Sequence, residues 1–204
     1  MADHPVAAGV AHFLEELRHA LDDVEATDDR ARLLPLAGGI ALATDLVVAQ
    51  TGAGRKLMFV GNGASAAIAS HQAVDFWKTG RMRAIAFNDA AQLTCLGNDY
   101  GYAQVFEKPV EMFADAGDVL VAISSSGRSE NIIKAVRMAR EKRARVVTFS
   151  GFAPDNPLRA LGDVNFYVPS KSYGHVEVTH LALLHGMLDA IVAVYGVPPH
   201  GEPA

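Results

Sequence analysis

Apolar and polar residues alternate in blocks along most of the chain. Five short apolar runs are separated by segments with helical periodicity. These runs cover residues 56–61, 84–87, 118–123, 145–150 and 164–169. Runs this short and this apolar are typical of parallel strands that are buried on both faces of a sheet. The pattern therefore predicts an α/β fold, a three-layer doubly wound sheet of five parallel strands.

The segments between and around these runs predict helices. Within the sheet region the expected helices are 65–78, 129–142, a short piece near Leu158, and a last one at 176–194. Two further amphipathic helices, 12–24 and 30–49, precede the first strand and carry apolar residues three and four positions apart. A doubly wound domain does not need both of them to cover its own sheet, so we expect them to pack against other subunits.

The length of 204 residues fits one domain. We expect that domain to span 1–196, with the helical pair lying within 1–53. The segment 197–204, "VPPHGEPA", carries three prolines and a glycine and is expected to be a flexible tail.

Charge and cysteine content narrow the class of protein. The formal net charge is −5, which argues against general affinity for nucleic acid. Cys95 is the only cysteine, so no internal disulfide can form. Neither a signal sequence nor an apolar span of membrane length is evident, and we expect a cytoplasmic protein that binds neither nucleic acid nor membrane.

Two turns that follow predicted strands carry candidate chemistry. In a doubly wound sheet, ligands bind beyond the carboxyl ends of the strands. The first turn, "GNGASAA" at 61–67, combines flexible glycines with the start of a helix. The second, "ISSSGRSENI" at 123–132, places four serines and a glycine before another helix. Hydroxyls and free N–H groups at helix N-termini can cradle a phosphate, although the serines could also serve only as helix caps.

A dinucleotide site is the competing interpretation of the first turn. "GNGASA" fits the pattern G-x-G-x-x-A, and Asp89 lies where a ribose-binding acid would be expected. The pattern alone is weak, and a dinucleotide fold would not need the serine cluster after the third strand. We therefore favour phosphate binding.

Histidines and carboxylates on two predicted helices suggest a metal site or a proton relay. His71 and Asp75 are four residues apart and share one helix face. On the last helix, local spacing favours Glu177 with His180, because Glu177 and His185 are about 12 Å apart along the axis. Each histidine taken alone is more often a core or surface residue, so spacing does not decide between these pairs.

The chain resembles sugar isomerase (SIS) domain proteins and, within them, the phosphoheptose isomerases. The motifs that carry the resemblance are "GNGASAAIASH" at 61–71, "LGNDYGY" at 96–102, "GDVLVAISSSGRS" at 117–129 and "HLALLH" at 180–185. The resemblance implies a flavodoxin-like sheet and a homotetramer with active sites between subunits. It also implies conversion of sedoheptulose 7-phosphate to D-glycero-D-manno-heptose 7-phosphate, a step toward the heptose of lipopolysaccharide.

The resemblance also assigns residues. It implies that the phosphate is held by Ser65, Ser124, Ser125, Ser126 and Ser129. The sugar side would be formed by Asn62, Gly63, Asp99 and Glu177.

One Zn²⁺ per subunit is implied as well, with the ligands His71, Asp75, Glu177 and His185. Asp75 stands where the family usually has glutamate, Glu177 where it has glutamine, and His175 where it has arginine. Zinc accepts the first two changes. Asp75 and His185 would form the acid–base pair of an enediol mechanism, with zinc polarising the carbonyl.

Two rival functions remain open at this point. An isomerase for another phosphosugar is the first, because the altered residues lie on the sugar side. The second is a non-catalytic SIS protein of the type that associates with the DnaA initiator. Because such proteins tend to lose the acid–base pair, the presence of His71, Asp75 and His185 favours an enzyme.

Overall fold

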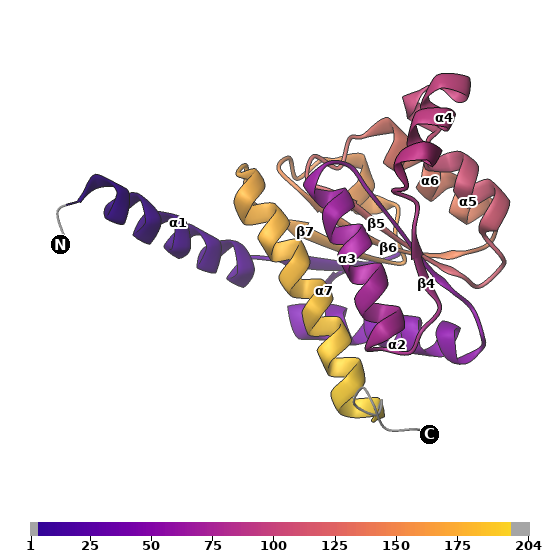
Figure 1. The fold of residues 1–204 in the computed structure, drawn as a ribbon. Coiled ribbons are helices and arrows are strands. Elements are labelled where there is room, and N and C mark those ends of the chain that lie inside the picture. The colour runs from indigo at the N-terminus through magenta and orange to yellow at the C-terminus, as the bar shows by residue number, and fades with distance from the viewer. Residues whose placement is uncertain (1–3, 197–204) are drawn as a thin grey trace.

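A single mostly parallel sheet organises the protein. The computed structural model describes residues 4–196 and contains seven strands in the order β2-β1-β7-β6-β5-β3-β4 (Figure 1). Five of them are parallel, as expected: β3 (Leu57–Gly61), β4 (Ala84–Ala86), β5 (Val119–Ser124), β6 (Arg145–Gly151) and β7 (Val164–Val168). Each lies within one or two residues of a predicted run.

The strand order creates a crevice between β3 and β5. After β3 the chain moves to β4 on one side, and it then returns to place β5 on the other side of β3. The five parallel strands thus follow the flavodoxin-like order 2-1-3-4-5, in which ligands bind where the direction of winding reverses. The register pairs Gly61 with Ile123, so the two predicted ligand turns leave the sheet side by side.

Two short antiparallel strands at one edge were not predicted. They are β1 (Glu25–Asp28) and β2 (Leu33–Leu34), and β1 pairs with β7. The expected helix at 30–49 was therefore wrong at its start. Pro35 precedes α2 (Leu36–Gly52) and fixes the backbone at its entry, so helical structure begins only after it.

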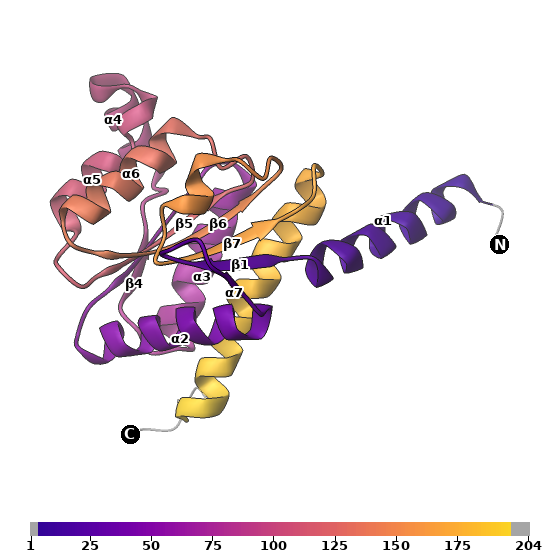
Figure 2. The ribbon, with the colours of Figure 1, turned by 180° about the vertical axis from the view of Figure 1, so that it is seen from behind.

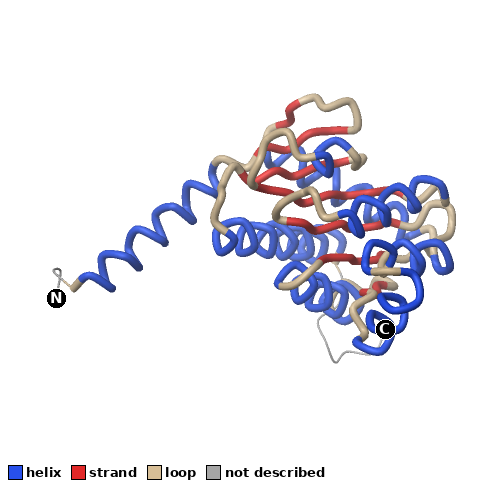
Figure 3. The backbone as a smooth tube through the Cα atoms, turned by 90° about the horizontal axis from the view of Figure 1, so that it is seen from above, coloured by secondary structure: helices blue, strands red, loops and turns tan. Residues whose placement is uncertain are grey.

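Helices cover both faces of the sheet, as Figures 2 and 3 show. On one face α2, α3 (Ala64–Lys78) and α7 (Tyr173–Tyr195) pack against alternate strand residues such as Phe59 and Phe149. On the other face α5 (Glu107–Phe113) and α6 (Glu130–Glu141) pack against the intervening residues, such as Val60 and Leu120. This division follows from the two-residue periodicity of strands and confirms the three-layer prediction.

The first helix, α1 (Pro5–Asp22), extends away from the body of the molecule (Figure 1). It begins seven residues earlier than predicted, because His4 caps it and Pro5 occupies its first position. Only Ala20 of this helix is buried, and its exposed apolar residues are Val6, Val10, Phe13 and Leu14. These four share one helix face by spacing. Phe13 packs against His175 of α7, with the ring centroids 4.6 Å apart, and the face otherwise remains exposed.

Two helices between β4 and β5 were also not predicted. They are α4 (Ala90–Tyr100) and α5, joined by the 3₁₀ turn η1 (Tyr102–Gln104). Asp89 caps α4 by accepting a hydrogen bond from the Gln92 amide at 2.9 Å. A second 3₁₀ turn, η2 (Pro157–Ala160), is the short helical piece expected near Leu158.

The last helix corrects one sequence expectation. α7 is long and apolar enough to cross a membrane by length and composition alone, so the statement that no such span exists was wrong. Its buried residues, including Leu184 and Met187, belong to the core between the sheet and the neighbouring helices. The predicted tail, 197–204, lies outside the described residues.

Candidate active site

A small polar cavity lies at the carboxyl ends of β3 and β5. It encloses about 130 Å³ and is open to the surface. Its lining comes from the turns that follow β3 and β5 and from the beginnings of α3, α6 and α7. The lining residues are Asn62, Ser65, Ser124, Ser125, Ser126, Ser129, Tyr173 and Glu177. Helix N-termini present unpaired N–H groups, so this serine cavity suits an anion.

The serines of this cavity are not all occupied by helix capping. The hydroxyl of Ser125 is buried and has no hydrogen-bond partner. Ser129 is the N-cap of α6, as expected, but its side chain makes no capping bond and lies 3.4 Å from the Ser124 hydroxyl. Ser126 accepts a bond from the Arg128 amide. The hydroxyls of Ser125 and Ser129 are thus not used in helix capping and are available to a ligand.

Glycines allow the backbone to form this cavity. A Cβ on Gly61 would lie 2.4 Å from the carbonyl oxygen of Ser65, so a larger residue would push the first turn of α3 away. Gly127 has a φ of 60°, and a Cβ there would meet the side chain of Asn156. Gly63, the N-cap of α3, is exposed and also has positive φ. The glycines that suggested a dinucleotide motif therefore shape the serine cavity.

A cluster of His71, Asp75 and His185 lies between α3 and α7. The Asp75 Oδ2 atom is 3.0 Å from His71 Nε2 and 3.9 Å from His185 Nδ1. One potential ligand atom from each residue lies within 4.8 Å of the other two. Two imidazoles and a carboxylate are a donor set that suits zinc, so the residues present fit such an ion.

Glu177 lies apart from this cluster. It lines the serine cavity instead, about two helical turns before His185 on α7. Burial raises the pKa of its carboxyl group above the ordinary value. Of the four expected zinc ligands, His71, Asp75 and His185 therefore lie together in the single chain, and Glu177 lies apart from them.

Two other residues singled out in the sequence lie elsewhere. His180, which local spacing favoured as the partner of Glu177, is fully buried, and its Nε2 atom is 3.0 Å from the carbonyl oxygen of Ser150. Burial lowers its pKa to about 4, so it is a neutral core residue. Asp99 is exposed on α4 and contacts Asn98 and Cys95 rather than the cavity. Asp89, the candidate ribose ligand, is used as a helix cap.

Sequence reasoning missed Tyr173, Tyr102 and Asn131. Tyr173 lines the cavity from the first turn of α7. Tyr102 and Asn131 both hydrogen-bond to Asn62. The "LGNDYGY" motif pointed to the region of Tyr102, but its aspartate rather than its tyrosine was selected.

Similarity to known proteins agrees with the fold and the cavity. Residues 12–151 match the model of the SIS domain family, and the chain belongs to this family. More narrowly, it belongs to the phosphoheptose isomerases. A phosphoheptose isomerase of a Bradyrhizobium species is 40% identical over 198 residues, which cover 94% of each chain. That of Geobacter sulfurreducens is 37% identical over 76% of this chain and 85% of its own.

Solved structures give the same result. The phosphoheptose isomerase of Neisseria gonorrhoeae superposes with a TM-score of 0.81 at 33% identity, covering 91% of this chain and 99% of that protein. The enzyme from Francisella tularensis has the same TM-score at 27% identity, covering 93% of this chain and all of that protein. The predicted family, fold and aldose–ketose isomerase class are confirmed.

Proposed function

We propose that the protein converts sedoheptulose 7-phosphate to D-glycero-D-manno-heptose 7-phosphate through an enediol. One observation carries this proposal: the serine cavity and the His71–Asp75–His185 cluster share the same two helices. Ser65 and His71 are six residues apart on α3, about 9 Å along its axis. A phosphosugar whose phosphate lies in the cavity can extend along α3 and α7 toward the cluster.

The phosphate would be held without basic side chains. Among residues 4–196, no lysine or arginine lines the serine cavity. Ser65, Ser124, Ser125, Ser126 and Ser129 would donate hydroxyl hydrogen bonds, and the N-termini of α3 and α6 would add backbone N–H groups and favourable dipoles. Asn62, Gly63 and Glu177 would contact the sugar next to the phosphate, and Asp99 would need to reach the site of another subunit.

The cluster would supply the chemistry. His71, Asp75 and His185 would hold one Zn²⁺ per subunit, and Glu177 would join them only by a change of position or through the substrate. A bound zinc ion would polarise the sugar carbonyl. Asp75 and His185 would move the proton between the neighbouring carbons of the sugar, and their side chains are 25% and 40% exposed.

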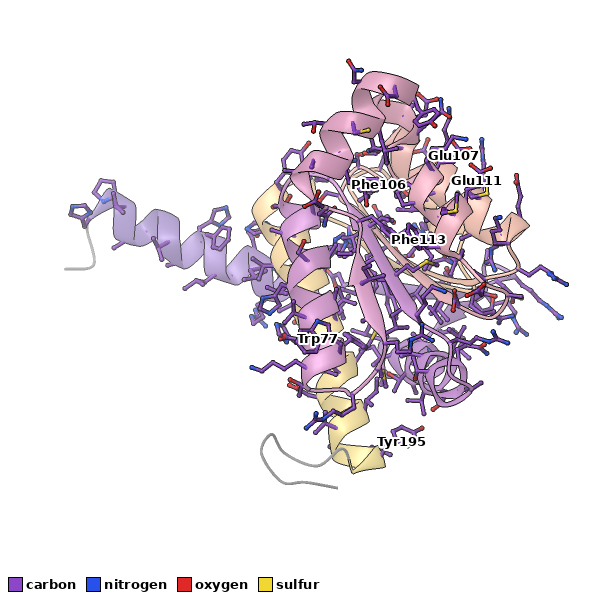
Figure 4. The ribbon with its side chains drawn as sticks, turned by 45° about the vertical axis from the view of Figure 1, so that its right-hand side comes forward. Trp77, Phe106, Glu107, Glu111, Phe113 and Tyr195 are labelled. Carbon is purple, nitrogen blue, oxygen red and sulfur yellow. The ribbon has the colours of Figure 1, made fainter. Side chains whose placement is uncertain are left out.

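We further propose a homotetramer with its active sites between subunits. The exposed apolar face of α1 is one surface that a second copy would cover. Another lies at β4, the edge strand of the described sheet, where Ile85 on β4 and Val74 on α3 are exposed. Trp77 on α3 is exposed as well (Figure 4). Light scattering should give a mass near four chains at micromolar concentration. A stable monomer would contradict this proposal.

The expected setting is cytoplasmic, with a small phosphosugar as the ligand and neither nucleic acid nor membrane as a partner. The acidic net charge and the place of α7 in the core support this part of the proposal.

A substrate panel tests the proposal. Purified protein should be assayed with sedoheptulose 7-phosphate and with other ketose and aldose phosphates, before and after removal of metal by a chelator and after addition of zinc. We expect turnover of the seven-carbon substrate that falls on chelation and returns with zinc. If only a different phosphosugar were converted, that sugar would replace sedoheptulose 7-phosphate as the proposed substrate. Binding without any turnover would favour a non-catalytic SIS protein.

A further inference from the structure

A three-residue hydrogen-bond network fixes the side chain of Asn62 at the rim of the serine cavity. The Asn62 amide forms two reciprocal hydrogen bonds with the amide of Asn131: Asn62 Nδ2 donates to Asn131 Oδ1 at 2.9 Å, and Asn131 Nδ2 donates to Asn62 Oδ1 at 2.8 Å. The Tyr102 hydroxyl also donates to Asn62 Oδ1, at 3.0 Å. The three residues come from the turn after β3, the start of α6 and η1.

A backbone donor determines the orientation of both amides. The N–H of Ile132 donates to Asn131 Oδ1 at 3.0 Å, and a backbone N–H cannot act as an acceptor. If the Asn131 amide were flipped, its NH₂ group would face this N–H. Because Asn131 is held in one orientation, the reciprocal pair holds Asn62 in one orientation too.

This orientation limits what Asn62 can offer a ligand. Its oxygen already accepts two hydrogen bonds, which uses both lone pairs, and one of its two N–H bonds is directed at Asn131. One N–H remains. Since Asn62 lines the cavity, a ligand there can meet this side chain only with an acceptor oxygen.

The network also joins parts of the site that are distant in sequence. Asn131 is almost fully buried within the core-facing side of α6, whereas Tyr102 is 61% exposed. The turn after β3 and the start of α6, which follows the serine turn, are thus linked by a partly buried amide pair. The tyrosine adds a hydrogen bond from the "LGNDYGY" segment to the same side chain.

We propose that Tyr102 and Asn131 are positioning residues that fix Asn62 as a single-donor contact to the phosphosugar. This inference rests on the proposed phosphosugar isomerase function. Tyr102 is the sharper probe, because its exposed hydroxyl can be removed with little effect on packing. Tyr100, two positions earlier, is also exposed, and no hydrogen bond of its hydroxyl is seen among the described residues, so Tyr100→Phe is the matched control.

The test is a double-mutant cycle of Tyr102→Phe and Asn62→Ala. For sedoheptulose 7-phosphate we expect Tyr102→Phe to lower kcat/KM by about threefold to tenfold, the range for one lost hydrogen bond. It should leave the melting temperature and the inhibition constant of inorganic phosphate unchanged, because the serines still bind phosphate. In the Asn62→Ala background, Tyr102→Phe should have no further effect, and Tyr100→Phe should be silent in both backgrounds.

Asn131→Asp gives a second, independent arm. Aspartate keeps the acceptor for Ile132 and Asn62 but loses the N–H donated to Asn62 Oδ1. We expect a loss of kcat/KM greater than that of Tyr102→Phe, without loss of the fold as judged by circular dichroism. An additive cycle, or a Tyr102→Phe enzyme equal to wild type, would overturn the inference while leaving the isomerase proposal intact.

Failure of the isomerase proposal would be seen separately. If wild-type protein binds sedoheptulose 7-phosphate in calorimetry but does not convert it, the double-mutant cycle is repeated with the dissociation constant of this sugar as the measured quantity. Non-additive binding would then support the network without the enzyme. Absence of phosphosugar binding by wild type would overturn both.

Discussion

The two parts of the candidate site are built in different ways. The serine cavity is formed by turns at the ends of buried strands, and Ser65, Ser124 and Ser125 are each at most 5% exposed. The cluster is formed where two helices face each other, and the side chains of His71 and His185 remain 54% and 40% exposed. The proposed phosphate site thus lies in the buried part of the fold, while the groups proposed for the chemistry lie where solvent or a second subunit can reach them. This contrast predicts that the two parts can be disabled independently.

The largest expected effect follows from removing His185. Replacing it with Gln should lower isomerase activity by about 10²- to 10⁴-fold, because an acid–base group and a zinc ligand are lost together. The dissociation constant of inorganic phosphate should stay within about twofold, since the serines are untouched. The control is Asp189→Asn, because Asp189 is exposed and lies one turn after His185 on α7. Equal activity of His185→Gln and wild type would remove His185 from the mechanism.

A smaller effect, on stability, distinguishes His180 from His185. His180 has a pKa of about 4 in the folded protein, against 6.5 ordinarily, because burial disfavours its charged form. Above about pH 6.5 both the folded and unfolded states hold it neutral. Between pH 6.5 and 4 only the unfolded state binds the proton, so stability falls as pH falls, by about 3 kcal/mol in total.

Urea unfolding at a series of pH values would measure this loss. In His180→Gln the slope between pH 6.5 and 4 should be shallower than in wild type, whatever the absolute stability of the variant. Identical slopes would mean that His180 titrates normally in the folded protein.

The next prediction concerns the free hydroxyl of Ser125. Ser125→Ala should weaken binding of phosphosugar and of inorganic phosphate by about 1–2 kcal/mol, the cost of a hydrogen bond lost to a charged ligand. Unphosphorylated sugars should bind equally well to both proteins. Ser70→Ala, an exposed serine on the second turn of α3, should change neither affinity. Unchanged phosphate affinity in Ser125→Ala would argue that the cavity is not the phosphate site.

The smallest effects compare a serine that does not cap with an aspartate that does. Ser129→Ala should change the free energy of unfolding by less than about 0.5 kcal/mol, because its hydroxyl makes no capping bond, yet it should weaken phosphosugar binding. Asp89→Ala should do the opposite and cost about 1 kcal/mol of stability through the lost cap of α4. A stability loss in Ser129→Ala without a binding loss would restore the interpretation of that serine as a helix cap.

The sequence predicted the parallel strands well because each is a continuous apolar run buried on both faces. It did not predict β1 and β2, because Glu25–Asp28 is stabilised by pairing with β7, more than 130 residues away, rather than by its own pattern. The helix α4 was missed for a related reason: none of its residues is buried, so no apolar stripe marks it.

The candidate site was predictable to the same extent. Turns directly after strands gave the serine cavity, because the sheet brings their ends together. Helix spacing alone chose His180 over His185, and the structure shows why it could not decide: position 180 faces the sheet, whereas position 185 faces α3. The role of Tyr102 depends on a contact 40 residues away in sequence, which no local pattern contains.

In the part of the chain that the structure describes, the serine cavity is lined by no lysine or arginine, and this affects how phosphosugar binding should respond to ionic strength. Dissolved salt screens the attraction between separated charges over a distance of about 8–10 Å at physiological concentration. Hydroxyls and helix N-termini act over a shorter range, in direct contact with the phosphate. Binding of a phosphosugar should therefore change little between dilute buffer and physiological salt. Its association rate should also gain little from long-range electrostatic steering, so selection among phosphorylated metabolites depends on close fit after contact.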